Sequence, residues 1–189
     1  MYPDPLLGVE VYKLAAARAR DSWTRGALCE NSGMTGTPPR PRGVLRLPIV
    51  ERSALVTFSP AQMYALVNDV ARYPEFLPWC ASARVEEVSP TERLAAVKAA
   101  KGPVRMQFTT RNTLRPDAEI LMQLAEGPFS RLTGRWTFDA VGERGSRVLF
   151  RVDFEFKSRM MAAAFNPMFQ SVCDSIVDAF VLRAQSIYR

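Results

Sequence analysis

Histidine is absent from this chain of 189 residues. The absence excludes a Ser-His-Asp or Cys-His catalytic arrangement, an HExxH zinc site and a carboxylate–histidine metal triad. It also removes the side chain best suited to acid–base catalysis near neutral pH. Catalysis by carboxylate, Tyr, Lys or Cys stays open, but the sequence favours a binding protein and predicts neither a catalytic residue nor a metal site.

Cysteines and long hydrophobic runs are scarce. Cys29, Cys80 and Cys173 form no CxxC pair and no even set, which indicates free thiols in a reducing compartment. No apolar run approaches about 18 residues, so no transmembrane helix is expected. Acidic residues number 19 against 25 Lys and Arg. This excess permits a phosphate-rich or anionic-membrane partner.

The first 45 residues differ in composition from the rest. Prolines and glycines gather between Asn31 and Gly43, which is typical of a linker. Three interpretations stay open: an over-extended reading frame whose true start is Met34, a disordered appendage, or a targeting segment. We expect residues 46–189 to form one domain, located in a bacterial cytoplasm or at the inner membrane surface, with the mitochondrial matrix less favoured.

The pattern becomes regular from residue 46. Residues 46–58 are rich in β-branched side chains and predict a strand. The segment Ser59–Gln62 marks a helix start, with serine as N-cap, proline as first helical residue and glutamine closing a capping box. Pro74 and Pro78 delimit a second, short helix. The first helix carries an apolar face made of Met63, Leu66, Val67 and Val70.

Six further segments alternate between apolar and polar residues and are separated by short turn signals, which indicates antiparallel hairpins with one buried and one exposed face. These segments are 81–88, 93–101, 104–115, 119–126, 130–141 and 146–157. A long helix follows over Arg159–Tyr188, in which Pro167 predicts a kink or a break. Its apolar stripe comprises Met161, Phe165, Met168, Phe169, Val172, Ile176, Phe180 and Ile187.

These elements predict an α+β fold. A curved seven-stranded antiparallel sheet must cover its buried face, and the C-terminal helix is the one element long enough to do so. A sheet wrapped around one helix leaves space between the two, and the two short helices can close one end. The predicted fold therefore contains an apolar ligand pocket.

Eight motifs occur in order along these elements and together cover about residues 47–188: 53–56, 61–70, 73–80, 108–112, 127–129, 132–138, 154–156 and 178–180. In this set the chain resembles the START-like, helix-grip superfamily of polyketide cyclase-like proteins. It resembles most the branch that includes coenzyme Q-binding proteins and ribosome association toxins.

The resemblance implies two functions. The first is a ubiquinone-binding protein that supports respiration as a quinone chaperone, and this is the main prediction, with ubiquinone or another isoprenoid lipid as ligand and no required cofactor. The alternative is a ribosome association toxin that binds the large ribosomal subunit and inhibits translation initiation. A helix-grip cyclase or hydrolase is a third, disfavoured reading. A monomer is the default, and the sequence does not identify an antitoxin partner.

Candidate site residues follow from the predicted faces. Each aromatic candidate can equally be ordinary core, and the arginines can equally be part of a solvated sheet face. The predicted pocket lining is Phe76, Leu77, Trp79, Phe108, Trp136, Phe138, Phe150, Phe154, Phe165, Phe169 and Ile176. Candidate polar contacts for a quinone head are Tyr64, Tyr73, Thr110 and Asn112. A basic face for ribosomal RNA or membrane would comprise Arg105, Arg111, Arg131, Arg135 and Arg151.

Overall fold

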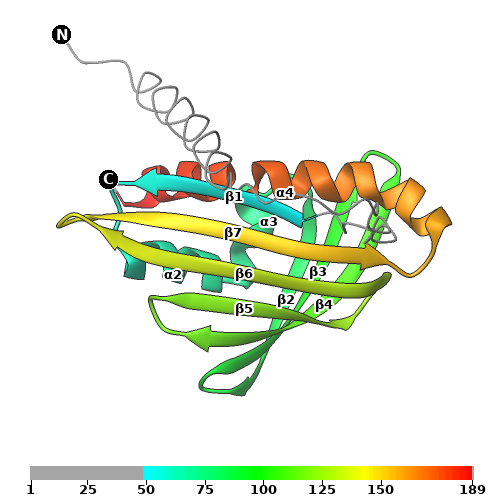
Figure 1. Ribbon diagram of the computed structural model, residues 1–189, viewed down its shortest axis with the longest axis horizontal. Coiled ribbons are helices and arrows are strands. Elements are labelled where there is room, and N and C mark those ends of the chain that lie inside the picture. The colour runs from blue at the N-terminus through cyan, green and yellow to red at the C-terminus, as the bar shows by residue number, and fades with distance from the viewer. Residues whose placement is uncertain (1–48, 189) are drawn as a thin grey trace, which may run out of the picture. The chain divides into compact units, whose positions relative to one another are not determined.

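The computed structural model describes residues 49–188, so the predictions for residues 1–45 and for the start of the first strand lie outside the described part. Seven strands form one antiparallel sheet in the order β1-β7-β6-β5-β4-β3-β2 (Figure 1). They are β1 (Ile49–Val56), β2 (Cys80–Ser89), β3 (Glu92–Lys101), β4 (Val104–Arg115), β5 (Glu119–Glu126), β6 (Phe129–Val141) and β7 (Gly145–Phe156). The predicted α+β class and sheet are confirmed.

The helices also follow the prediction, except that the first of them ends before Val70, which lies in a 3-10 turn instead of on the apolar face of the helix. They are α2 (Pro60–Asn68), a 3-10 turn (Val70–Arg72), α3 (Tyr73–Phe76) and α4 (Arg159–Ile187). The capping box of α2 is present: the Gln62 backbone N–H donates to Ser59 Oγ over 3.3 Å, and the Ser59 N–H donates to Gln62 Oε1 over 2.9 Å. Pro74 lies in the first turn of α3, where its missing N–H leaves no helical bond unmade.

Alternation along the strands places every second side chain in the core. In β7 the inward residues from Val148 to Phe156 are all buried, whereas Arg147, Arg151 and Glu155 face solvent. The hairpin between β3 and β4 turns at Gly102, whose φ of +60° lies in the left-handed region that favours glycine. One face of the sheet is therefore apolar and available for a helix.

Helix α4 covers that face, packing against β1, β7 and β4 (Figure 1). Its stripe is buried from Met168 to Phe180, but Ile187 is 45% exposed, so its inclusion in the stripe is wrong. Ile187 is the last helical residue and no further turn covers it, while Ala184 takes the buried position. None of the helices in residues 49–188 combines the length and apolar character needed to cross a membrane.

Pro167 predicted a kink or a break in this helix, and the break is absent, because α4 is continuous. Proline removes the N–H that would bond the carbonyl of Ala163. Ala163 and Pro167 are both exposed, so water can satisfy that carbonyl. The helix therefore tolerates the proline on its outer side.

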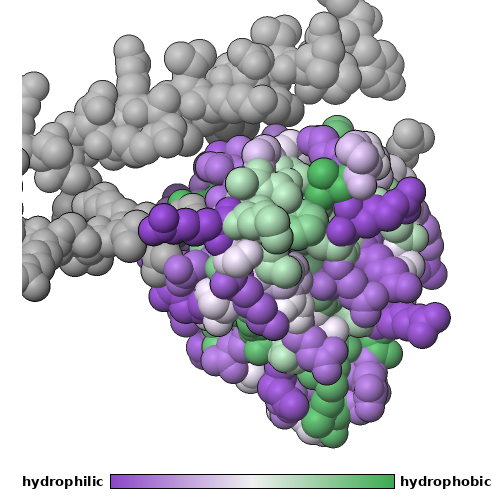
Figure 2. Space-filling view, turned by 90° about the vertical axis from the view of Figure 1, so that its right-hand side faces the viewer, coloured by the Kyte–Doolittle hydropathy of each residue, from purple (hydrophilic) through white to green (hydrophobic). Residues whose placement is uncertain are grey.

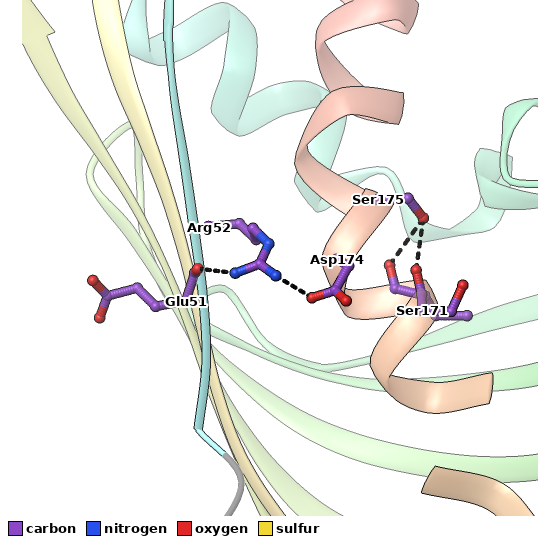
Figure 3. A network of polar contacts seen from close by, with 6 residues as sticks. Glu51, Arg52, Ser171, Asp174 and Ser175 are labelled. Carbon is purple, nitrogen blue, oxygen red and sulfur yellow. Dashed lines mark hydrogen bonds and ion pairs between the residues drawn. The ribbon is translucent and has the colours of Figure 1, made fainter. Parts of the chain in front are cut away.

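Polar contacts fasten α4 at its middle and at its end. Arg52 on β1 pairs with Asp174 (Figure 3), and Lys101 Nζ donates to Ser171 Oγ over 2.7 Å. Near the C-terminus, Arg183 pairs with Glu75 of α3 over 2.5 Å. Exposed pairs of this kind contribute about 0–1 kcal/mol each. They orient the helix, and the buried apolar stripe supplies most of its attachment.

Candidate functional site

A cavity of about 80 Å³ lies between the inner face of the sheet and α4. Its lining is almost entirely apolar and comes from the α2 end, the central strands and the middle of α4. Six of the predicted lining residues contribute to it: Trp79, Phe108, Trp136, Phe150, Phe169 and Ile176. The predicted pocket thus occurs where the sheet wraps around the helix.

The other five predicted lining residues lie outside the cavity and pack in the core instead. Phe76 contacts the ring of Phe180, with ring centres 5.2 Å apart. Leu77, the C-cap residue of α3, is 1% exposed. The remaining three pack against neighbouring aromatic rings: Phe138 against Tyr64 and Trp136, Phe154 against Phe129 and Phe169, and Phe165 against Phe156. All five are buried or half-buried, so periodicity alone could not separate them from the lining residues.

The prediction missed the smaller residues of the lining. They share inward positions on the strands or apolar positions on the helices, and the same alternation that located the aromatics could have found them. They are Val67, Val70, Ala95, Val97, Ala99, Met106, Ile120, Met122, Leu132, Val152, Val172 and Cys173. Two of these residues, Ala95 and Ala99 on β3, have short side chains that leave space in the cavity which larger residues would fill.

The size of the cavity limits its occupant. Sites for drug-sized ligands measure roughly 300–1,000 Å³, and an engineered apolar cavity of about 150 Å³ binds benzene. At about 80 Å³ this cavity has room for a very small molecule in the conformation described. A quinone with an isoprenoid tail requires the cavity to open.

Two polar side chains from β4 line this apolar space. Thr110 is 4% exposed and Asn112 is 6% exposed, and Asn112 Oδ1 has no hydrogen-bond partner among the described residues. Leaving such an acceptor buried and unpaired costs about 1–3 kcal/mol. The position of Asn112 therefore suits a ligand or water that donates a hydrogen bond.

The two tyrosines considered for a quinone head are placed differently. Tyr73 lines the cavity, but its hydroxyl donates to the carbonyl of Val67 over 2.6 Å, and burial raises its pKa. Tyr64 lies outside the cavity, beside Arg93 and Asp117. Neither hydroxyl is available to a molecule inside the cavity in this arrangement.

The cysteines of the described region are weak nucleophiles. Burial raises the pKa of the Cys80 thiol to about 11, although a hydrogen bond with the Ser82 backbone acts in the opposite direction. Burial also raises the pKa of Cys173, which lines the cavity. Both thiols are protonated at neutral pH, whereas the thiolate is the reactive form. Residues 49–188 contain no group of three or more Cys, Asp or Glu side chains placed to hold a metal ion.

The five arginines of the predicted basic face all project from the outer, exposed face of the sheet. Four of them are ion-paired: Arg111 with Glu92 at 2.5 Å, Arg131 with Asp153 at 2.8 Å, Arg135 with Glu119 at 3.4 Å and Arg151 with Glu51 at 3.7 Å. Arg105 has no ion pair among the described residues. Most of the predicted basic face is therefore a mixed-charge surface.

The combination of a wrapped sheet and an apolar cavity agrees with the family that the sequence matches. Residues 56–181 match the family described as polyketide cyclase/dehydrase and lipid transport. The chain belongs to this family. The polyketide cyclase and lipid transport description joins catalytic and binding members, so membership fixes the fold and leaves the activity open.

Relatives within the family carry two kinds of name. The ribosome association toxin RatA of Escherichia coli is 42% identical over 142 residues, which cover 75% of this chain and 90% of the relative. The mitochondrial coenzyme Q-binding protein COQ10 of Drosophila melanogaster is 29% identical over 134 residues, which cover 69% of this chain and 55% of that protein. Both names match the branch that the motifs resemble.

Solved structures agree with this chain in fold. The protein TTHA0849 of Thermus thermophilus aligns with a TM-score of 0.64 at 17% identity, covering 74% of this chain and 98% of the other. At this identity the likeness concerns the fold alone.

Proposed function

We propose that this chain associates with the large ribosomal subunit and inhibits translation initiation. The observation that carries the proposal is the 42% identity to a ribosome association toxin, which extends over 90% of that protein's length. The proposal includes no chemical step, which agrees with the two buried, protonated thiols in the described region.

This proposal reverses the preference drawn from the sequence. Ubiquinone binding was the main prediction, but the coenzyme Q-binding relative is more distant, at 29% identity over 55% of its length. The cavity of about 80 Å³ is also small for a quinone with a tail. Both observations favour the ribosome alternative.

Sedimentation tests the proposal. A lysate of cells that express the tagged chain is separated on a sucrose gradient, and the chain is expected in the large-subunit fraction. Purified chain added to separated subunits is expected to reduce the amount of joined ribosome that forms. A chain that stays at the top of the gradient and leaves subunit joining unchanged would falsify the proposal.

A second candidate function is binding of a small apolar molecule that donates a hydrogen bond. The observation in its favour is Asn112 Oδ1, which has no hydrogen-bond partner in the described part of the chain and lies in an almost entirely apolar lining. Mass spectrometry of an organic extract of the purified chain tests it. A quinone in the extract would support the ubiquinone prediction, and an extract free of small molecules would count against both.

A further inference from the structure

Three basic residues of the outer face differ from the ion-paired arginines described above. Arg84 on β2, Lys98 on β3 and Arg105 on β4 are exposed, and none of them forms an ion pair among the described residues. Their charges are therefore available to an external partner. We call these three residues the basic strip.

Strand register brings the three residues into one line. Lys98 lies directly opposite Ser82 on β2 and Gln107 on β4. Arg84 and Arg105 are each two residues from those positions, so both are diagonal neighbours of Lys98 on the same face. Diagonal neighbours in an antiparallel sheet are about 7–8 Å apart, within reach of long side chains. The basic strip thus crosses three adjacent strands obliquely.

The surroundings of the basic strip contain little negative charge. Ser82, Ala96, Ala100 and Gln107 occupy the outward positions between the three basic residues. Glu86 is the next outward residue of β2 after Arg84, and it forms no ion pair with Arg84. Even with Glu86 included, positive charge exceeds negative charge here, and the Gln107 amide adds a neutral hydrogen-bond donor beside the basic strip.

We propose that the basic strip binds the phosphates of ribosomal RNA; this inference rests on the proposed ribosome association. Lys and Arg in a line suit a phosphate backbone, whereas recognition of single-stranded RNA bases commonly uses aromatic side chains on which the bases stack. The outward positions named above contain no aromatic side chain. The contact is therefore with the backbone and independent of base sequence. Three phosphate contacts predict a slope of log affinity against log salt of about −2 to −3.

Another exposed surface offers an alternative docking site. At the start of α4, Met160 is 80% exposed, and Ala163 and Ala164 are also exposed. Figure 2 shows an apolar patch at this end of the domain, flanked by hydrophilic side chains. An apolar patch cannot neutralise phosphate, so the basic strip is the better match to RNA. The test below therefore includes a variant of the patch as the alternative binding surface.

The test compares two triple variants with equal loss of charge. The strip variant combines Arg84→Gln, Lys98→Gln and Arg105→Gln. The matched control combines Arg111→Gln, Arg131→Gln and Arg135→Gln, which removes ion-paired arginines from the same face. Circular dichroism and thermal unfolding first establish that both variants fold. Fluorescence anisotropy with a labelled oligouridylate then measures RNA affinity over a series of salt concentrations, and pelleting measures association with purified large subunits.

The strip variant is expected to lose at least about tenfold in RNA affinity and to lose most of the salt slope, while the control stays close to the wild type. Equal losses in both variants, or none in the strip variant, overturn the inference. So does a strip variant that loses binding only to anionic phospholipid vesicles, or a Met160→Ser variant that alone abolishes pelleting. If the wild-type chain fails to pellet with large subunits, the proposed function fails, and the anisotropy data still decide whether the basic strip binds RNA.

Discussion

Asn112 is placed on a strand face that otherwise contains apolar side chains and Thr110. Its Oδ1 is buried and has no hydrogen-bond partner within residues 49–188, which lowers the stability of the empty protein. A buried polar residue of this kind is expected where a bound molecule donates the hydrogen bond that the empty protein does not supply. The sequence indicated that this asparagine would need a partner if buried, but the missing partner became evident only in the structure.

Replacing Asn112 with leucine is predicted to stabilise the ligand-free chain. Removing an unpaired acceptor from an apolar site recovers about 1–2 kcal/mol of unfolding free energy, since the side chains have similar volume. Urea unfolding of the purified chain measures the change. Thr113→Leu, at the exposed neighbouring position, controls for a general effect of leucine on β4. A loss of more than about 1 kcal/mol in Asn112→Leu would mean that the amide is already satisfied.

Elements that depend on local sequence were predictable. The capping box of α2 needs only Ser59 and Gln62 three residues apart, and the strand limits follow from alternation and turns, so both agree with the structure. Alternation also indicates which strand residues point inward, but it does not show which of them line the cavity, because Phe150 and Phe154 share one face of β7 and only Phe150 lines it. The position of α4 over the sheet decides between them, and no local pattern encodes it.

Local sequence patterns also could not predict which charged residues pair on the outer face of the sheet. Arg131 pairs with Asp153 because β6 and β7 align Thr133 opposite Asp153, which places the two charges on a diagonal. A register shifted by two residues would change the partner while leaving every side chain on the same face. The sequence therefore predicted which arginines are exposed, and the register determines which are neutralised.

The capping box of α2 gives a prediction at the scale of an element. Ser59→Ala removes the acceptor for the Gln62 N–H and is expected to lower the unfolding free energy by about 1 kcal/mol. Guanidinium unfolding measures the loss. Ser175→Ala is the matched control, because the Ser175 hydroxyl bonds carbonyls inside α4 (Figure 3) and its removal is expected to change stability by less than about 0.5 kcal/mol. Equal effects of the two substitutions would contradict the assignment of the cap.

Cavity and core are not separate regions in the whole molecule. Trp136 is 2% exposed and lines the cavity, yet its ring also packs against Phe138, Phe150 and Phe180. From the sequence, Trp136 could either line the pocket or pack in the core, and in the structure it does both. Its removal should therefore affect the stability of the whole domain and enlarge the cavity at the same time.

Trp136→Ala is predicted to lower the unfolding free energy by about 3–5 kcal/mol, a large part of the roughly 5–15 kcal/mol that stabilises a domain. Indole, which replaces the missing ring, should bind in the enlarged apolar space and raise the thermal midpoint of the variant by mass action. Thermal unfolding with and without indole measures both effects. The wild-type chain is the control, since its Trp136 already occupies that space, and its midpoint should not change. An equal rise in both proteins would place the indole elsewhere, and no rise in the variant would show that the domain collapses around the lost ring.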